Sequence, residues 1–135
     1  MTRHLTQRVL VAVTIGCSGA SDARSTSAFH EIGRFRAPNM HALFPGVTHF
    51  VVAPESVMGD RNAVLTYSRH ACGAGDEQIC FVLFWPNESN AARGFPLTNS
   101  QADAMVASYS RNRSTGYDDL QCYNFGPAAA RCAKR

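Results

Sequence analysis

The chain has 135 residues and a mass of 14.7 kDa, with 45% of its residues hydrophobic and 17% charged. This length suits one domain with a packed core, and the composition argues against an intrinsically disordered chain. No run approaches the roughly 20 apolar residues of a membrane-spanning helix, and a net charge of only +3 argues against a nucleic-acid-binding protein.

Residues 1–20 have the parts of a secretory signal peptide. A polar start with two arginines precedes the apolar run 9–16, and small residues follow at 18–20. The alternative is the first strand of a cytosolic domain, because VLVAV at 9–13 has high β-propensity. Charged and Ser/Thr residues follow the run, which favours export, and we expect 21–28 to be a short tether.

Two processing routes fit this leader. Cleavage after Ala20 releases a chain that starts at Ser21. Alternatively, residues 14–17 (TIGC) resemble a bacterial lipobox, whose cysteine becomes the lipidated first residue, although that motif favours Leu where this chain has Thr14. Removing the two leader arginines from the thirteen basic residues leaves eleven against ten acidic residues, a net charge of +1. We therefore expect a periplasmic or secreted protein or, with lipidated Cys17, an outer-membrane-anchored lipoprotein.

The first half of the domain reads as a helix followed by two strands. Phe29, Ile32 and Phe35 lie three residues apart, which predicts a short amphipathic helix ending near Arg36, before Pro38. Residues 47–53 are rich in β-branched side chains and predict a strand. Apolar and polar residues alternate over 63–68, which predicts a second strand.

The second half reads as a strand, a helix and a strand. Residues 79–85 are apolar on both faces, so we expect them to form the central strand, antiparallel to 63–68. Residues 86–97 read as an irregular loop. Thr98 and Gln101 form a capping box, and a helical stripe continues to Tyr109. Residues 120–125 predict the last strand.

The predicted fold class is α+β, with a small antiparallel sheet of about four strands in the order α-β-β-β-α-β and helices packed on one face. We expect a single domain over 29–126 and a basic tail over 127–135.

Four cysteines remain once Cys17 is set aside, and an even number suits a disulfide framework. Short separations favour Cys72–Cys80 and Cys122–Cys132, each stabilising the fold by about 2–3 kcal/mol. A zinc site or a nucleophile built on Cys72 and His70 would need free thiols, and the close cysteine pairs typical of zinc sites are absent. We expect no metal and no cofactor.

No catalytic motif stands out. The residues around Ser56 lack the first glycine of G-x-S-x-G, and the chain has neither a glycine-rich phosphate loop nor H-E-x-x-H. We therefore expect a non-catalytic binding or accessory module of the cell envelope. The alternative is a small secreted hydrolase, which needs a pocket holding two titratable groups within hydrogen-bond distance, such as His49 or His70 with an acid.

The loop 86–97 is the segment most suggestive of recognition, since it has an aromatic residue near each end. The candidate binding residues are Trp85, Arg93, Phe95, Tyr117 and Tyr123. The alternative is that Trp85 and Phe95 fold inward as a small core of the loop. A protein or small ligand in the envelope is the expected partner, and no nucleic acid.

Overall fold

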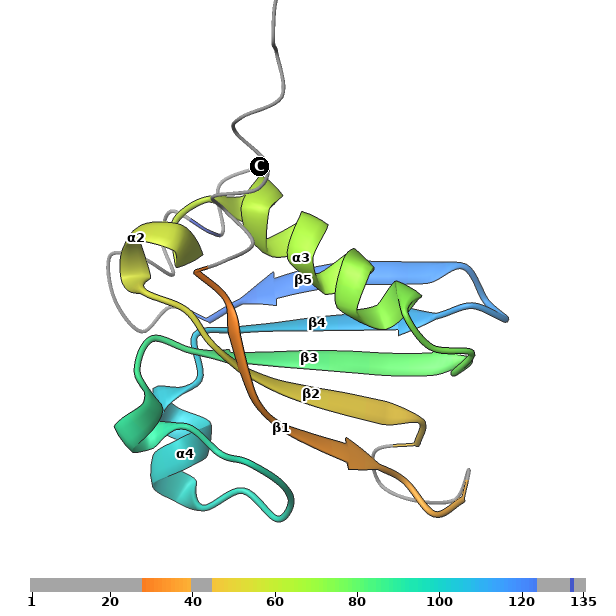
Figure 1. Cartoon of the computed structure of the whole chain (residues 1–135), viewed down its shortest axis with the longest axis horizontal. Coiled ribbons are helices and arrows are strands. Elements are labelled where there is room, and N and C mark those ends of the chain that lie inside the picture. The colour runs from red at the N-terminus through yellow and green to blue at the C-terminus, as the bar shows by residue number, and fades with distance from the viewer. Residues whose placement is uncertain (1–27, 40–44, 124–131, 133–135) are drawn as a thin grey trace, which may run out of the picture.

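The computed structural model describes residues 28–39, 45–123 and Cys132 (Figure 1). The leader with Cys17, nearly all of the tether and most of the basic tail lie outside these residues. The elements are β1 (His30–Arg36), β2 (Val47–Val52), α2 (Glu55–Met58), α3 (Arg61–Gly73), β3 (Ile79–Trp85), the 3-10 turn η1 (Glu88–Asn90), α4 (Asn99–Ala104), β4 (Ala107–Asn112) and β5 (Tyr117–Cys122).

The strands form one five-stranded mixed sheet in the order β1-β2-β3-β4-β5. The β2–β3 pair is parallel, and the other three pairs are antiparallel. A parallel pair requires a crossover connection, and α2 and α3 supply it between β2 and β3. The α+β class is thus confirmed, whereas the purely antiparallel sheet of about four strands and its element order were wrong.

Residues 30–36 form strand β1 and not the predicted helix. The β1–β2 register shifts between Glu31 and Gly33, which marks a β-bulge. Because the bulge adds one residue to the strand, Ile32 and Phe35 both reach the same cluster of apolar side chains. Their spacing of three residues therefore imitates a helical period.

Residues 61–73 form helix α3 and not the predicted strand. Asp60 caps the helix, and its carboxylate accepts hydrogen bonds from the backbone N–H groups of Asn62 and Ala63 at 3.0 and 3.1 Å. The buried residues of α3 are Val64, Ser68 and Cys72, which lie four residues apart on one side of the helix. The predicted antiparallel pairing of 63–68 with 79–85 is consequently wrong.

The capping box at Thr98 and Gln101 is confirmed, with both reciprocal hydrogen bonds present at 2.9 and 3.2 Å. Helix α4 nevertheless ends at Ala104. The next two residues of the predicted helical stripe, 105 and 106, belong to no helix or strand, and Tyr109 belongs to β4. Tyr109 is fully buried there, between β3 and β5. The last strand, β5, ends at Cys122, and the end of the predicted strand 120–125 lies outside the described residues.

Each side of the sheet carries its own apolar cluster. We call the side covered by α3 the helix face; its cluster includes Val51, Val64, Val82 and Phe84. We call the other side the loop face, because its cluster of Phe50, Leu83, Trp85 and Ala92 packs against residues of the segment 86–105. The prediction that helices cover only one face was therefore wrong, while the central position of β3 is confirmed.

Both predicted disulfides are present. Cys72–Cys80 joins the last turn of α3 to β3, and Cys122–Cys132 joins the end of β5 to the tail. Two disulfides are compatible with an oxidising, extracytoplasmic location. In the part of the chain that the structure describes, no helix has the length and apolar character needed to cross a membrane.

Candidate functional site

Trp85 and Phe95 point into the protein. The Trp85 side chain is fully buried, stacks on Phe50, and donates a hydrogen bond from Nε1 to the backbone oxygen of Gln101 at 2.8 Å. The Phe95 ring packs edge-to-face against Phe35 and Phe50. Both aromatic residues therefore hold the segment 86–105 on the loop face.

Arg93 fastens the same segment to the edge of the sheet. Its guanidinium forms an ion pair with Glu88 and donates to the backbone oxygen of Ile32 in β1 at 3.0 Å. Gly33 lies so close to the backbone of Arg93 that a Cβ there would overlap the Arg93 carbonyl. Arg93 remains mostly exposed, and one of its roles is to cover the bulged edge of β1.

The two tyrosines lie at opposite ends of β5. Tyr117 begins the strand and is 48% exposed, more than any other large hydrophobic residue of the described chain. Tyr123 follows the strand, and its hydroxyl lies 2.7 Å from Oγ of Ser108. Strands β3 and β5 are both antiparallel to β4 and therefore run in the same direction. Because Trp85 ends β3 and Tyr117 begins β5, the two residues lie at opposite ends of the sheet. The five predicted residues therefore do not form one patch.

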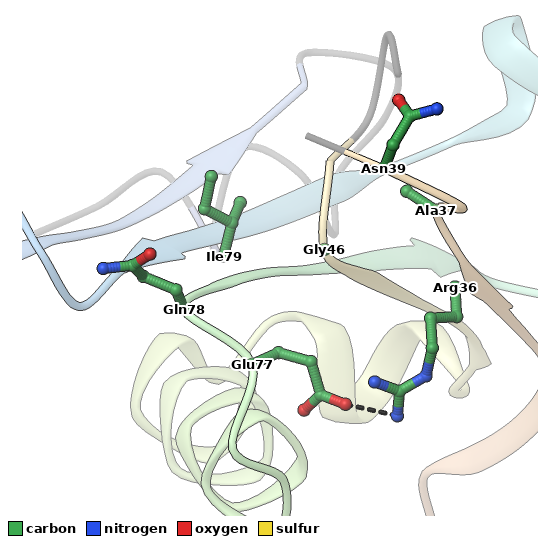
Figure 2. A pocket seen from close by; sticks show the side chains of 7 residues that line it. All are labelled: Arg36, Ala37, Asn39, Gly46, Glu77, Gln78 and Ile79. Atoms are coloured by element: carbon green, nitrogen blue, oxygen red, sulfur yellow. Dashed lines mark ion pairs between the residues drawn. The ribbon is translucent and has the colours of Figure 1, made fainter. Parts of the chain in front are cut away.

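Three hollows instead lie at one end of the sheet, where β1 and β4 finish and β2, β3 and β5 begin. This end of the sheet is on the right in Figure 1. The Tyr117 hollow, on the loop face, has a volume of about 390 Å³. The end pocket, shown in Figure 2, has about 240 Å³. The His49 pocket, on the helix face, has about 140 Å³ and is the most enclosed of the three. The hollows are adjacent, because neighbouring ones share Ile79 or the pair Arg36 and Glu77.

The Tyr117 hollow is apolar with a few hydrogen-bonding groups. Ile79 and Phe81 of β3 project toward the loop face there and are partly buried. The lining residues are Pro45, Ile79, Phe81, Ser110, Arg111, Asn112, Thr115 and Tyr117. The segment 86–105 packs against the other end of this face, over Phe50, Leu83 and Trp85.

An ion pair between Arg36 and Glu77 lies where the end pocket meets the His49 pocket. Figure 2 shows the two side chains facing each other, with Ile79 on the opposite side of the sheet. Arg36 is about two-thirds exposed and Glu77 only 14% exposed. A hydrogen bond from its own backbone N–H, together with Arg36, holds the pKa of Glu77 below its usual value. Glu77 is therefore ionised at neutral pH.

A second charged group lies at the His49 pocket, where Arg34 and His49 line the wall and Glu31 contacts both of them. His49 is buried, and its Nδ1 lies 2.8 Å from Oε2 of Glu31. The other carboxylate oxygen of Glu31 accepts a hydrogen bond from Nε of Arg34 at 2.9 Å. Burial alone would raise the pKa of Glu31, but the hydrogen bonds from Arg34 and His49 outweigh it and lower that pKa. Since an ionised carboxylate only accepts hydrogen bonds, Nδ1 of His49 carries the proton.

Apart from Tyr117 and His49, sequence inspection did not identify the residues that line these hollows as site candidates. Glu31 was placed on the predicted helix, and Glu77 lay between the two predicted strands 63–68 and 79–85. The β1–β2 pairing, with Arg34 opposite His49, brings Glu31 and Arg34 to His49, and the parallel β2–β3 pairing brings Glu77 to the same end of the sheet. Of the five predicted binding residues, Tyr117 is the one that lines any of these three hollows.

Comparisons with protein-family models, with curated proteins and with solved structures found no match to this chain. Within residues 28–39, 45–123 and Cys132, no group of three or more His, Cys, Asp or Glu side chains is arranged to hold a metal ion.

Proposed function

We propose that the chain is an exported, non-catalytic binding module whose ligand occupies the Tyr117 hollow. The observation that carries this proposal is the concave, mainly apolar hollow beside the most exposed large hydrophobic side chain of the described chain. Export follows from the expected leader, and the two disulfides are compatible with it.

The lining of the hollow favours a small ligand with an apolar body and one or two hydrogen-bonding groups. Its volume of about 390 Å³ lies within the range typical of small-molecule sites, which combine apolar walls with a few polar groups. Ile79, Phe81 and Tyr117 offer apolar contact, whereas Ser110 and Asn112 on β4 offer hydroxyl and amide groups.

Indole is a suitable probe, since it has an apolar body and one N–H donor. An NMR titration of the oxidised protein should give saturable shifts at the amides of Ile79, Ser110 and Tyr117. Tyr117→Ala should weaken indole binding about fivefold, because an aromatic contact contributes about 1 kcal/mol. Tyr123→Ala, at the other end of β5, is the matched control and should leave the affinity unchanged. Scattered shifts without saturation would contradict the proposal.

A second candidate function, a small hydrolase, is favoured by the His49–Glu31 pair at 2.8 Å beside a pocket. A histidine whose Nδ1 is held by a carboxylate is a typical general base. Chromogenic esters, phosphate esters and glycosides test it. Turnover by the wild-type protein that His49→Gln abolishes and His70→Gln preserves would establish catalysis. Equal background rates in all three proteins would exclude it for these substrates.

A further inference from the structure

The His49 pocket differs from the Tyr117 hollow in its chemistry, because charged side chains surround it. Arg34, Arg36, His49 and Glu77 line it, and Glu31 lies behind His49 at 2.8 Å. The remaining walls are small or apolar and include Val47 of β2 and Ala71 and Ala74 at the end of α3. A ligand here would meet both charged groups and a short apolar surface.

The charges around this pocket balance only while His49 is neutral. Arg34 pairs with Glu31, and Arg36 pairs with Glu77. Protonation of His49 adds a third cation to these two cations and two anions. Since His49 is only about 5% exposed, water does little to screen the additional charge. An anion in the pocket would restore the balance.

Hydrogen-bond donors for an anion are available. With Nδ1 held by Glu31, protonation of His49 places the new N–H at Nε2, the other side of the ring. A guanidinium has five N–H donors. Two nitrogens of Arg34 donate to Glu31, at 2.9 and 3.3 Å, and one nitrogen of Arg36 pairs with Glu77. Each arginine therefore has further N–H groups beyond those used in these contacts.

We propose that the His49 pocket binds a small carboxylate of about the size of acetate, and that it does so when His49 is protonated. The planar carboxylate matches the fork of an arginine. The methyl group fits against Val47, Ala71 and Ala74, and this apolar contact favours a carboxylate over phosphate. The site lies on the helix face and is independent of the Tyr117 hollow.

The other titratable groups near His49 do not change this pH dependence. Glu31 and Glu77 have lowered pKa values and stay ionised when His49 gains its proton. Tyr67 of α3 lies near Glu31 and Arg34, and burial raises its pKa, so its hydroxyl stays neutral. Histidine is the side chain whose ordinary charge change falls between about pH 5 and pH 8, so a comparison of mildly acidic with neutral pH tests the role given to His49.

The test is an NMR titration of the oxidised protein with sodium acetate at pH 5.5 and pH 8.0. The buffer compounds are amines, whose charged form is a cation, so that they do not compete with acetate for the pocket. The amides of Val47, Ala74 and Gly75 should shift saturably, and acetate should bind at least tenfold more tightly at pH 5.5. Phosphate should bind several-fold more weakly than acetate at pH 5.5. No saturation at pH 5.5, equal affinity at both pH values, or phosphate binding as tight as acetate binding would overturn the proposal.

Variants test whether acetate binds in the His49 pocket and not elsewhere on the surface. His49→Gln should remove the pH dependence, and His70→Gln, an exposed histidine of α3, should preserve it. Arg36→Gln changes a side chain that is mostly exposed, so the fold should persist while acetate affinity at pH 5.5 falls several-fold. This variant tests the site even if His49→Gln does not fold. Unchanged acetate affinity in Arg36→Gln would contradict the assignment.

Discussion

The carboxylate of Glu31 lies 2.8 Å from Nδ1 of His49, although the two residues belong to different strands and lie 18 positions apart in the sequence. The β-bulge of β1 lies directly beside Glu31. Nε of Arg34 donates a hydrogen bond to the other oxygen of the same carboxylate. Glu31 is therefore held in its ionised form by two donors, one of them nearly buried.

The lowered pKa of Glu31 predicts a loss of stability in acid. A carboxyl group whose pKa is lower in the folded than in the unfolded chain stabilises the fold above the unfolded value, near 4.5, and loses that contribution as the pH falls through the folded value. The free energy of unfolding, measured with urea, should therefore decrease between pH 6 and pH 3. Glu31→Gln should flatten this decrease and cost about 1 kcal/mol at pH 6.

Glu55→Gln is the control for this experiment, because Glu55 is an exposed carboxylate of α2. It should preserve the full acid dependence. A wild-type stability that stays constant from pH 6 to pH 3, or a Glu31→Gln protein with the wild-type slope, would contradict the prediction.

A second prediction concerns Gly33. A Cβ at this position would overlap the backbone carbonyl of Arg93, so Gly33→Ala must push the segment 86–105 away from β1. We expect a loss of about 1–3 kcal/mol in the free energy of unfolding, as for other overpacked positions. Gly73→Ala is the matched control, since a Cβ there meets no atom within 4 Å. Alanine has the higher helix propensity, so this control should stabilise α3 by up to about 1 kcal/mol.

Gly33 also shows why the fold could be predicted only in part from the sequence. Local signals were sufficient for β2, β3, the capping box and both disulfides. The bulge lies beside Gly33, which packs against the backbone of Arg93, 60 positions further along, and no local pattern reveals this contact. In α3, only three residues are buried, so the helical period was weaker than the accidental alternation over 63–68.

The candidate site was harder to predict than the fold, because its parts come from separate segments. Glu31, His49 and Glu77 meet only after β1 pairs with β2 and after α3 returns the chain to the start of β3. Sequence inspection could name His49 as one member of a possible titratable pair but not its acid, because Glu31 was assigned to a helix. Tyr117 could be chosen from residue type alone, but its neighbours Ile79 and Phe81 were assigned wholly to the core.

A third prediction distinguishes internal packing from recognition at the segment 86–105. Trp85→Phe removes the hydrogen bond to the Gln101 oxygen and part of a fully buried ring, so it should cost about 2–3 kcal/mol of unfolding free energy. Arg93→Ala removes an exposed ion pair and should cost at most about 1 kcal/mol. Urea unfolding measures both. A Trp85→Phe protein as stable as the wild type would show that the indole contributes little to packing.

A fourth prediction concerns the disulfides. Replacing Cys72 and Cys80 together by alanine opens a loop whose ends are 8 residues apart, and the loss of this restraint on the unfolded chain should cost about 3 kcal/mol. The double alanine variant of Cys122 and Cys132, 10 residues apart, should lose a similar amount. Urea unfolding of the two variants and the wild type gives both values. A change below about 0.5 kcal/mol in either variant would mean that its disulfide does not restrain the unfolded chain as assumed.

The last prediction tests export. When the gene is expressed with its own leader, the intact mass should correspond to a chain starting at Ser21 or to one that begins with a lipidated Cys17. Alkylation before reduction should leave Cys72, Cys80, Cys122 and Cys132 unmodified, because all four are in disulfides. Alkylation after reduction should add four groups to the Ser21 form. A full-length mass with thiols that react before reduction would contradict export and would restore Cys72 and His70 as candidates for thiol chemistry.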